Sequence, residues 1–391
     1  MKVLFFTNEY SHPDLPPCGG VGTLFKILSK ELSKRGHKVY VYGFSKKKHH
    51  VFDEEIEIIF FKKYSKKYII SEFIRSLSSR LNLTKIEEKY LKKERIYLSK
   101  KLKKFAKKNN IDIIQSFTFN GFTAFWDNTI PLIVRFDGSR GFWEKHLNSK
   151  KDSLKIAMEK KALQTTPYTV ANSFFSAKFI KEYYNVKVNT IIQNGIDTKI
   201  FSPDYSIELI TKSIFYFGTI SEAKGLKNLA LIFNEVVNQS PDASLHLLGR
   251  GEKYMNYLKE NVFSQKALKN IHYYGHTPLY EIPQKIMQAS LVVVPTLGET
   301  FGFTIVEAMA MEKITIVNNI PVAKEIITDG EDGFIAKDNQ HFVNLILEVL
   351  ESPSKYKHIG INARKKVLNN FTVEKMLDKS IEYFQKVLKK H

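Results

Sequence analysis

Short apolar runs alternate with amphipathic segments through the first half of the chain. The run KVLFFT (2–7) has the length of a strand, and residues 22–37 repeat leucine and isoleucine at helical spacing before they end in Gly36 and His37. Strands separated by such helices are typical of an open parallel sheet that is covered on both faces. Further strands are predicted at 38–43, 112–117, 131–136 and 168–173.

The second half repeats this rhythm, with strands predicted at 213–218, 243–249, 271–275, 290–295, 314–319 and 332–337. Two doubly wound sheets in tandem predict an α/β protein of two Rossmann-like domains, with a ligand cleft between them at the carboxyl ends of the strands. We expect the domains to cover residues 1–205 and 206–372. A last helix, 373–391, carries an apolar stripe and could pack back on the first domain.

Charge is concentrated in one part of the first domain. The chain has a formal net charge of +20, and residues 46–108 hold 20 Lys plus Arg against 8 Asp plus Glu. Thr84 and Glu87 form a capping box at the start of a helix within this basic segment. Either the helix is a surface helix that packs on the sheet, or the segment contacts an anionic membrane. Nucleic acid is a weaker interpretation because no nucleic-acid motif accompanies the charge.

Length and composition narrow the class of protein. A chain of 391 residues is long enough for two domains, and its one cysteine, Cys18, excludes an internal disulfide. The first residues do not resemble a signal peptide, and no apolar run reaches the length of a membrane span. We therefore expect a soluble cytoplasmic protein, with the inner face of the plasma membrane as the alternative location.

Three segments carry candidate chemistry. CGGVGT (18–23) joins the first strand to the first helix, where glycines allow a phosphate to approach unpaired N–H groups, although a simple tight turn would use the same residues. Lys224 precedes a helix in the second domain and could pair with a diphosphate, or could be one more surface lysine. In PTLGETFGFTIVEAMAM (295–311), Glu299 could accept sugar hydroxyls and Glu307 a ribose diol, with helix-starting N–H groups between them.

Other reaction classes lack their motifs. The sequence contains no HExxH, no Cys/His cluster, no GxSxG elbow and no GxGxxG fingerprint of a dinucleotide-dependent oxidoreductase. An Asp-x-Asp pair, which would hold Mg²⁺ or Mn²⁺ in many nucleotide-sugar enzymes, is also missing. We therefore expect neither a cofactor nor a metal.

Taken together, these segments resemble a retaining glycosyltransferase of family four, which has the GT-B architecture. The resemblance covers nearly the whole chain and is strongest from IIQNGIDTKIFSP (191–203) to KEIITDGEDGFI (324–335). Its most specific part is the pair of glutamates eight residues apart, followed by Ala-Met. The resemblance implies a nucleoside-diphosphate-sugar donor, bound by the second domain, and a glycan or lipid-linked saccharide acceptor on the first.

The resemblance also implies residue roles. Lys224 would neutralise the departing diphosphate, Glu299 would contact the donor sugar and Glu307 would hold the ribose. Asp137 would face the acceptor, and it completes the predicted catalytic set. The other donor-binding residues implied are Gly19, Gly20, Val21, Thr219, Gly249, Arg250, His276, Thr277, Thr300, Phe301, Gly302 and Phe303, and no metal ligand is implied.

Two positions depart from the family pattern. Thr219 stands where the family usually has an arginine on the diphosphate, so Arg250 or another basic side chain would have to compensate. Asp137 stands where the family has a histidine, and a shift of one residue would put Phe136 there instead. We therefore expect a hexosyltransferase of surface polysaccharide synthesis, with a non-catalytic GT-B partner subunit, which binds another protein or a glycan, as the alternative.

Overall fold

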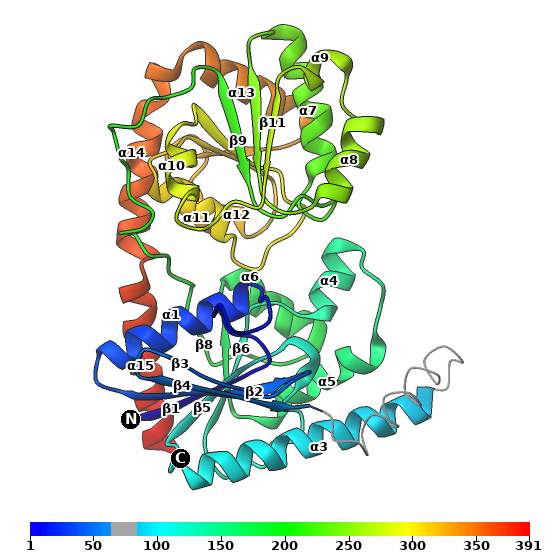
Figure 1. Cartoon of the computed structure of the whole chain (residues 1–391), viewed down its shortest axis with the longest axis vertical. Helices are drawn as coiled ribbons and strands as arrows, with labels where there is room; N and C mark the ends of the chain where they lie inside the picture. The colour runs from blue at the N-terminus through cyan, green and yellow to red at the C-terminus, as the bar shows by residue number, and fades with distance from the viewer. Residues whose placement is uncertain (64–83) are drawn as a thin grey trace. The chain divides into compact units, whose positions relative to one another are not determined.

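The computed structural model describes residues 1–63 and 84–391 (Figure 1). The chain divides into two compact units. Unit 1 holds residues 1–193 and 376–391, and unit 2 holds residues 194–375. The units thus divide after residues 193 and 375, whereas the predicted boundaries lay after residues 205 and 372. Residues 64–83 of the predicted basic segment lie outside the described part of the chain.

Unit 1 is built on one sheet whose strands follow the order β3-β4-β2-β1-β5-β6-β7-β8. All neighbouring pairs are parallel except β3 and β4. The strands are β1 (Lys2–Thr7), β2 (Lys38–Ser45), β3 (His49–Asp53), β4 (Ile56–Lys62), β5 (Ile113–Phe117), β6 (Leu132–Phe136), β7 (Tyr168–Ala171) and β8 (Thr190–Ile191). The inner strands β1, β5 and β6 are almost wholly buried, as strands covered on both faces must be.

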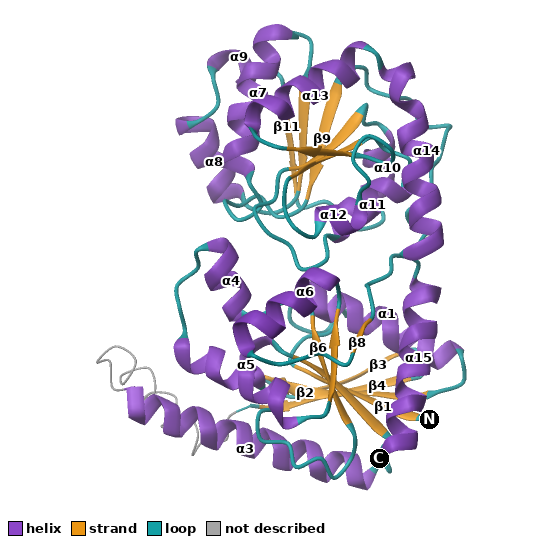
Figure 2. Ribbon diagram, turned by 180° about the vertical axis from the view of Figure 1, so that it is seen from behind, coloured by secondary structure: helices purple, strands orange, loops and turns teal. Residues whose placement is uncertain are grey.

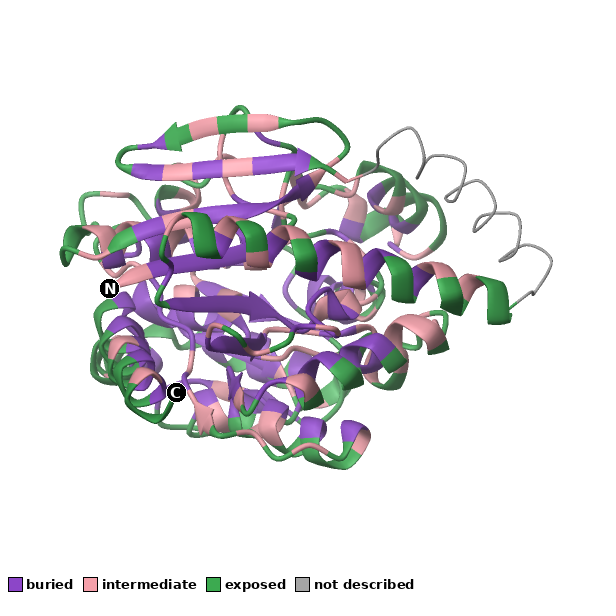
Figure 3. Cartoon of the chain, turned by 90° about the horizontal axis from the view of Figure 1, so that it is seen from below, coloured by how far each residue is buried: buried purple, intermediate pink, exposed green. Residues whose placement is uncertain are grey.

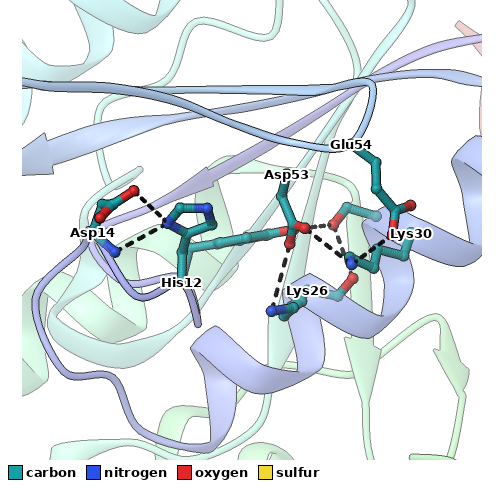
Figure 4. A network of polar contacts seen from close by, with 8 residues as sticks. His12, Asp14, Lys26, Lys30, Asp53 and Glu54 are labelled. Carbon is teal, nitrogen blue, oxygen red and sulfur yellow. Dashed lines mark hydrogen bonds and ion pairs between the residues drawn. The ribbon is translucent and has the colours of Figure 1, made fainter.

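The antiparallel pair of β3 and β4 extends the sheet beyond the predicted strands. The turn between them is tied to α1 (Gly20–Lys34) by a polar network in which Lys26 and Lys30 point toward Asp53 (Figure 4). The ammonium of Lys30 lies 2.9 Å from Asp53 Oδ1, and the buried hydroxyl of Tyr10 donates to Oδ2 at 3.2 Å. Because Tyr10 belongs to the loop after β1, the same network fixes the start of that loop.

Helices lie on both faces of the unit 1 sheet (Figure 2). After α1 come α3 (Thr84–Lys108), the short turn η1 (Phe119–Gly121), α4 (Arg140–Leu147), α5 (Ser153–Thr165), α6 (Phe174–Phe179), the π-helical turn η2 (Ile180–Tyr184) and residues 376–390 of α15 (Val373–Lys390). The predicted apolar stripe of α15 is buried at Met376, Leu377, Phe384 and Val387. Arg35, at the end of α1, pairs with Asp378 of α15.

Unit 2 has a parallel sheet with the order β11-β10-β9-β12-β13-β14. Its strands are β9 (Ser213–Phe217), β10 (Ser244–Leu248), β11 (Ile271–Gly275), β12 (Leu291–Val294), β13 (Thr315–Asn318) and β14 (Phe334–Ala336). Its helices are α7 (Leu226–Gln239), α8 (Glu252–Asn261), α9 (Gln265–Leu268), α10 (Ile282–Met287), α11 (Phe303–Ala310), α12 (Ala323–Ile326), α13 (Asn339–Glu351) and α14 (Pro353–Asn370). One face of the sheet forms a core with α7, α8 and α13.

Both sheets are therefore doubly wound, and their loops at the carboxyl ends of the strands are where a ligand would bind in such a fold.

Candidate functional site

Two loops at the carboxyl edge of the unit 2 sheet touch through their backbones. The loop after β9 ends at Gly225, which has a φ of +75°, and a Cβ there would lie 1.9 Å from the carbonyl oxygen of Pro295. The N–H of Leu297 donates to the carbonyl of Ala223 at 3.1 Å. Only glycine allows this close approach, which fixes the position of Lys224 beside the segment that follows β12.

Lys224 and Glu299 meet at this contact. The ammonium of Lys224 donates to Oε1 of Glu299, and the hydroxyl of Thr296 lies 3.4 Å from the same oxygen. The two side chains retain 35% and 20% of their accessible surface, so solvent reaches both. The fold thus brings together two of the three predicted catalytic residues, which are 75 positions apart in the sequence.

The neighbouring loops are equally close. A Cβ on Gly249, which has a φ of +143°, would lie 1.7 Å from the carbonyl oxygen of Gly218. The N–H of Gly218 donates to Leu248 at 2.8 Å, and that of Ile220 donates to Arg250 at 2.7 Å. The backbone at predicted residue Gly249 therefore accommodates only glycine. The turn leaves predicted residue Thr219 exposed, with its carbonyl accepting from the buried hydroxyl of Tyr216 at 2.9 Å.

Arg250 and His276 form an exposed pair next to this turn. The guanidinium of Arg250 donates to Nε2 of His276 at 3.0 Å. Thr277 is half-buried, and its hydroxyl lies 3.4 Å from the carbonyl oxygen of Gly275. The fold places these three predicted residues together, on the loops after β10 and β11. Arg250, which would have to compensate for Thr219, follows Gly249 and is already in contact with His276.

The helix α11 begins inside the predicted motif. Gly302 is its N-cap with a φ of +93°, and no side chain caps the helix. Within the described residues, the N–H groups of Phe303 and Thr304 have no hydrogen-bond acceptor. The ring of Phe301 is 2% exposed and packs edge-on against Phe303 and Phe371. Packing therefore accounts for both phenylalanines, and half-buried Thr300 precedes them.

Glu307 lies on α11 and is half-buried. Burial raises the pKa of its carboxyl to about 7. In the part of the chain that the structure describes, no donor lies within hydrogen-bond distance of its carboxyl oxygens. A half-buried carboxyl without an internal donor can accept hydrogen bonds from a ligand, and it would bind more strongly when ionised.

The predicted glycine segment of unit 1 is placed differently. The N–H of Gly19 donates to Oε2 of Glu9 at 2.6 Å, so an internal carboxylate occupies one of the groups expected to face phosphate. A Cβ on Gly20 would meet no atom within 4 Å, and Val21 is half-buried. Gly22 is the glycine that packing requires, because a Cβ there would lie 2.6 Å from the Cβ of Cys18.

Asp137 is held by a buried cation. The Nε of Arg135 donates to its Oδ1 at 3.1 Å, and the side chains of Arg135 and Asp137 are only 1% and 6% exposed. Arg135 also donates to the carbonyl of Ile192 at 2.8 Å. Phe136 is fully buried in β6, which removes it as a candidate for the acceptor-facing position. The third predicted catalytic residue thus lies in unit 1, within an internal ion pair.

Comparison with known proteins decides the family. The model of Glycosyltransferase Family 4 matches residues 18–200, and that of Glycosyl transferases group 1 matches residues 198–366. The two matches meet end to end and leave only the ends of the chain uncovered. The chain belongs to the family-four, group 1 glycosyltransferases.

Curated relatives of the glycosyltransferase match it over part of their length. The UDP-Gal:alpha-D-GlcNAc-diphosphoundecaprenol alpha-1,3-galactosyltransferase of Escherichia coli is 28% identical over 218 residues, which are 51% of this chain and 55% of the relative. The chain spans about half the length of the curated relatives it matches.

Solved structures show the fold of the glycosyltransferase. Sucrose-phosphate synthase from Thermosynechococcus elongatus has a TM-score of 0.79 at 15% identity and full coverage of both chains. The Anabaena protein HepE, solved with UDP and glucose, has a TM-score of 0.72 at 18% identity, covering 99% of this chain and all of that one. The prediction of GT-B architecture with two Rossmann-like domains is confirmed.

Sequence reasoning missed the buried carboxylate of Glu159. Glu159 of α5 is fully buried and accepts from the N–H groups of Asn120 and Arg140, both at 2.9 Å, and from the hydroxyl of Tyr184 at 2.7 Å. Burial raises the pKa of Glu159, and these donors oppose that rise. The available signal was an acid between Met158 and Ala162 on the apolar side of a helix. Glu159 holds the loop after β6 against η1.

Two features are absent from residues 1–63 and 84–391. No helix there is both long enough and apolar enough to cross a bilayer. In that same part of the chain, no three His, Cys, Asp or Glu side chains are grouped to hold a metal ion.

Proposed function

We propose that this glycosyltransferase moves a sugar from a nucleoside-diphosphate sugar to an acceptor hydroxyl with retention of anomeric configuration. The observation that carries the proposal is the contact between Lys224 and Glu299 at the carboxyl edge of the unit 2 sheet. A cation beside a carboxylate matches a ligand in which a charged diphosphate is joined to a neutral sugar. Glu307 and the N–H groups that begin α11 belong to the same edge.

Each group has a partner on such a donor. Lys224 pairs with the diphosphate, and the N–H groups of Phe303 and Thr304 donate to it at the positive end of α11. Glu299 accepts from hydroxyls of the sugar, and Glu307 accepts from the two hydroxyls of the ribose. His276 and Thr277, on the loop after β11, contact the base through their backbone.

The proposed reaction proceeds on one face of the sugar. The bond between the anomeric carbon and the diphosphate oxygen breaks, and the negative charge that develops on that oxygen is stabilised by Lys224 and by the N–H groups of α11. The departing oxygen accepts the proton of the acceptor hydroxyl, whose oxygen forms the new glycosidic bond on the same face. In this scheme protein cations and dipoles supply the counter-charge, so no metal is required.

Names of related proteins support a choice of substrates for the first tests. The Escherichia coli relative is named as using UDP-galactose and a diphosphoundecaprenol-linked acceptor, and the HepE structure holds UDP and glucose. We therefore propose a uridine nucleotide as donor and a lipid-linked saccharide or growing surface polysaccharide as acceptor.

A thermal-shift screen tests the donor. UDP and UDP-hexoses should raise the unfolding temperature, by more at higher affinity and concentration, and by more than equal concentrations of inorganic diphosphate. The product anomer, determined by NMR after turnover with the preferred UDP-hexose, should match the donor. A protein that binds none of UDP, GDP and ADP would contradict the proposal and favour a non-catalytic partner subunit, an alternative that Thr219 and the internal pairing of Asp137 motivate.

A further inference from the structure

The helix α3 presents a single-signed face to solvent. Its exposed lysines are Lys85, Lys89, Lys92, Lys93, Lys100, Lys104, Lys107 and Lys108. We call this set the lysine face. At 3.6 residues per turn, seven of the eight lie on the side away from the buried stripe of the helix, and Lys92 lies at its margin, one turn from the exposed Glu88. Glu87 is half-buried near the stripe. Lys93, Lys100 and Lys107, spaced by seven, form nearly one straight line.

Packing on the other side keeps the lysine face outward. Leu91, Leu98 and Leu102 are buried, and the ring of Phe105 stacks on Tyr42 of β2 with centroids 4.1 Å apart. In Figure 3 the buried and exposed residues of α3 alternate along its length, as expected for a helix with one covered side. The helix cannot rotate to hide its lysines without exposing this apolar stripe.

Polar contacts fix the helix to the rest of unit 1. The buried guanidinium of Arg95 donates to the carbonyl of Asn120 at 2.8 and 3.2 Å, and its plane lies over the ring of Phe122. Lys103, at the margin of the lysine face, pairs with Asp127 at 2.5 Å. Because Asn120 lies in η1, directly after β5, the first half of α3 is attached to the carboxyl edge of the unit 1 sheet.

In the described part of the chain, the lysines of the lysine face form no ion pair. Like charges on one helix repel one another, at a cost to stability. An external anionic surface would remove that repulsion.

We propose that the lysine face adsorbs on an anionic lipid bilayer. The lysine face runs from Lys85 to Lys108, about 24 residues or roughly 35 Å, which spans several lipid head groups in a plane, whereas a soluble anionic ligand would need a concave site. The face has few apolar residues to insert, since Ile86 is only 40% exposed and lies at its end. Attachment is therefore electrostatic and lies at the surface. The inference goes beyond the proposed reaction and does not depend on it.

Vesicle co-sedimentation tests this inference with the full chain. Wild type should bind vesicles of 70% phosphatidylcholine and 30% phosphatidylglycerol at 0.1 M salt, and should not bind pure phosphatidylcholine. The triple variant Lys93→Glu/Lys100→Glu/Lys107→Glu should bind the anionic vesicles at least about 100-fold more weakly. The matched control Lys253→Glu/Lys259→Glu/Lys266→Glu changes the net charge equally on exposed lysines of α8 and α9, and should change binding by less than about fivefold.

Three results would overturn the inference. The first is an equal loss of vesicle binding in the two triple Lys→Glu variants. The second is no binding of wild type to anionic vesicles. The third is a soluble polyanion that binds the lysine face more tightly than the vesicles do and releases the protein from them. The triple variant Lys93→Gln/Lys100→Gln/Lys107→Gln, which should lose about half as much on a logarithmic scale, guards against misfolding by charge reversal. Donor hydrolysis without vesicles should be unchanged in every variant, so a failed donor assay and a failed vesicle assay are distinguishable.

Discussion

At the carboxyl ends of the unit 2 strands, Lys224 and Glu299 pair with each other in reach of solvent, and Glu307 has no internal donor in the described residues. At the same edge of the unit 1 sheet, the carboxylates are already engaged. Asp137 is paired with buried Arg135, and Glu159 accepts hydrogen bonds from three backbone groups and a tyrosine. The two sheets share one architecture, but the polar side chains at their carboxyl edges differ. Those of unit 2 can be reached from solvent, and those of unit 1 are bonded internally.

The difference indicates which unit has charged side chains that a ligand can engage without breaking a buried pair. Groups that pair with each other near solvent can exchange partners with a ligand at little cost, because water already screens them. A buried pair cannot do so, because removing one partner leaves an uncompensated charge. We therefore expect substitutions in unit 2 to change catalysis, and substitutions of the paired residues in unit 1 to change stability.

The largest effect should come from Asp137→Ala. This change leaves Arg135 buried without its carboxylate and should lower the free energy of unfolding by about 3–5 kcal/mol, measured by urea denaturation. The double variant Arg135→Met/Asp137→Asn removes both charges and should recover most of the loss. If the double variant is stable yet turns over more than 100-fold slower than wild type, Asp137 takes part in catalysis and the comparison between the units fails.

Lys224→Ala should lower kcat by about 100- to 1000-fold, because the negative charge that develops on the leaving diphosphate loses its cation. The unfolding temperature should change little, since the side chain remains in contact with solvent. Initial rates with the preferred UDP-hexose measure the effect.

The matched control for Lys224 is Lys227→Ala, an exposed lysine in the first turn of α7. It should leave kcat within about twofold. Wild-type turnover from Lys224→Ala would contradict the role proposed for the pair with Glu299.

Gly249→Ala should cost about 2–3 kcal/mol of unfolding free energy, because its backbone has a φ of +143° and its Cβ would collide with the carbonyl of Gly218. Gly20→Ala is the matched change in unit 1, where the new Cβ would meet no atom, and it should be neutral or slightly stabilising. Thermal melts of both variants compare the two glycine turns. Equal losses would mean that both turns depend on close backbone contact.

These contrasts show which features the sequence could predict. Apolar runs located the strands well, since 2–7 and 213–218 coincide with β1 and β9 to within a residue. The pair β3 and β4 went unpredicted because charge dominated the interpretation of residues 46–108, although IEIIFF has strand character. The contact between Lys224 and Glu299 followed from family motifs. The partner of Asp137 could not be foreseen, because burial of Arg135 depends on a long-range bond to Ile192.

The smallest effect concerns Glu307 and pH. Burial raises the pKa of its carboxyl to about 7, above the usual value near 4.3, so the folded protein favours the neutral form. Its contribution to stability is thus fully present below about pH 4 and is lost as the pH rises through 7. The unfolding free energy should therefore fall across that window more in wild type than in Glu307→Gln.

Nucleotide binding should follow the opposite trend, because two ribose hydroxyls donate best to an ionised carboxylate. Calorimetric titration with UDP should show affinity rising up to about tenfold between pH 6 and 8 in wild type, and no comparable rise in Glu307→Gln beyond the titration of UDP itself. The same rise in both proteins would separate Glu307 from the ribose and weaken the assignment of unit 2 as the donor side.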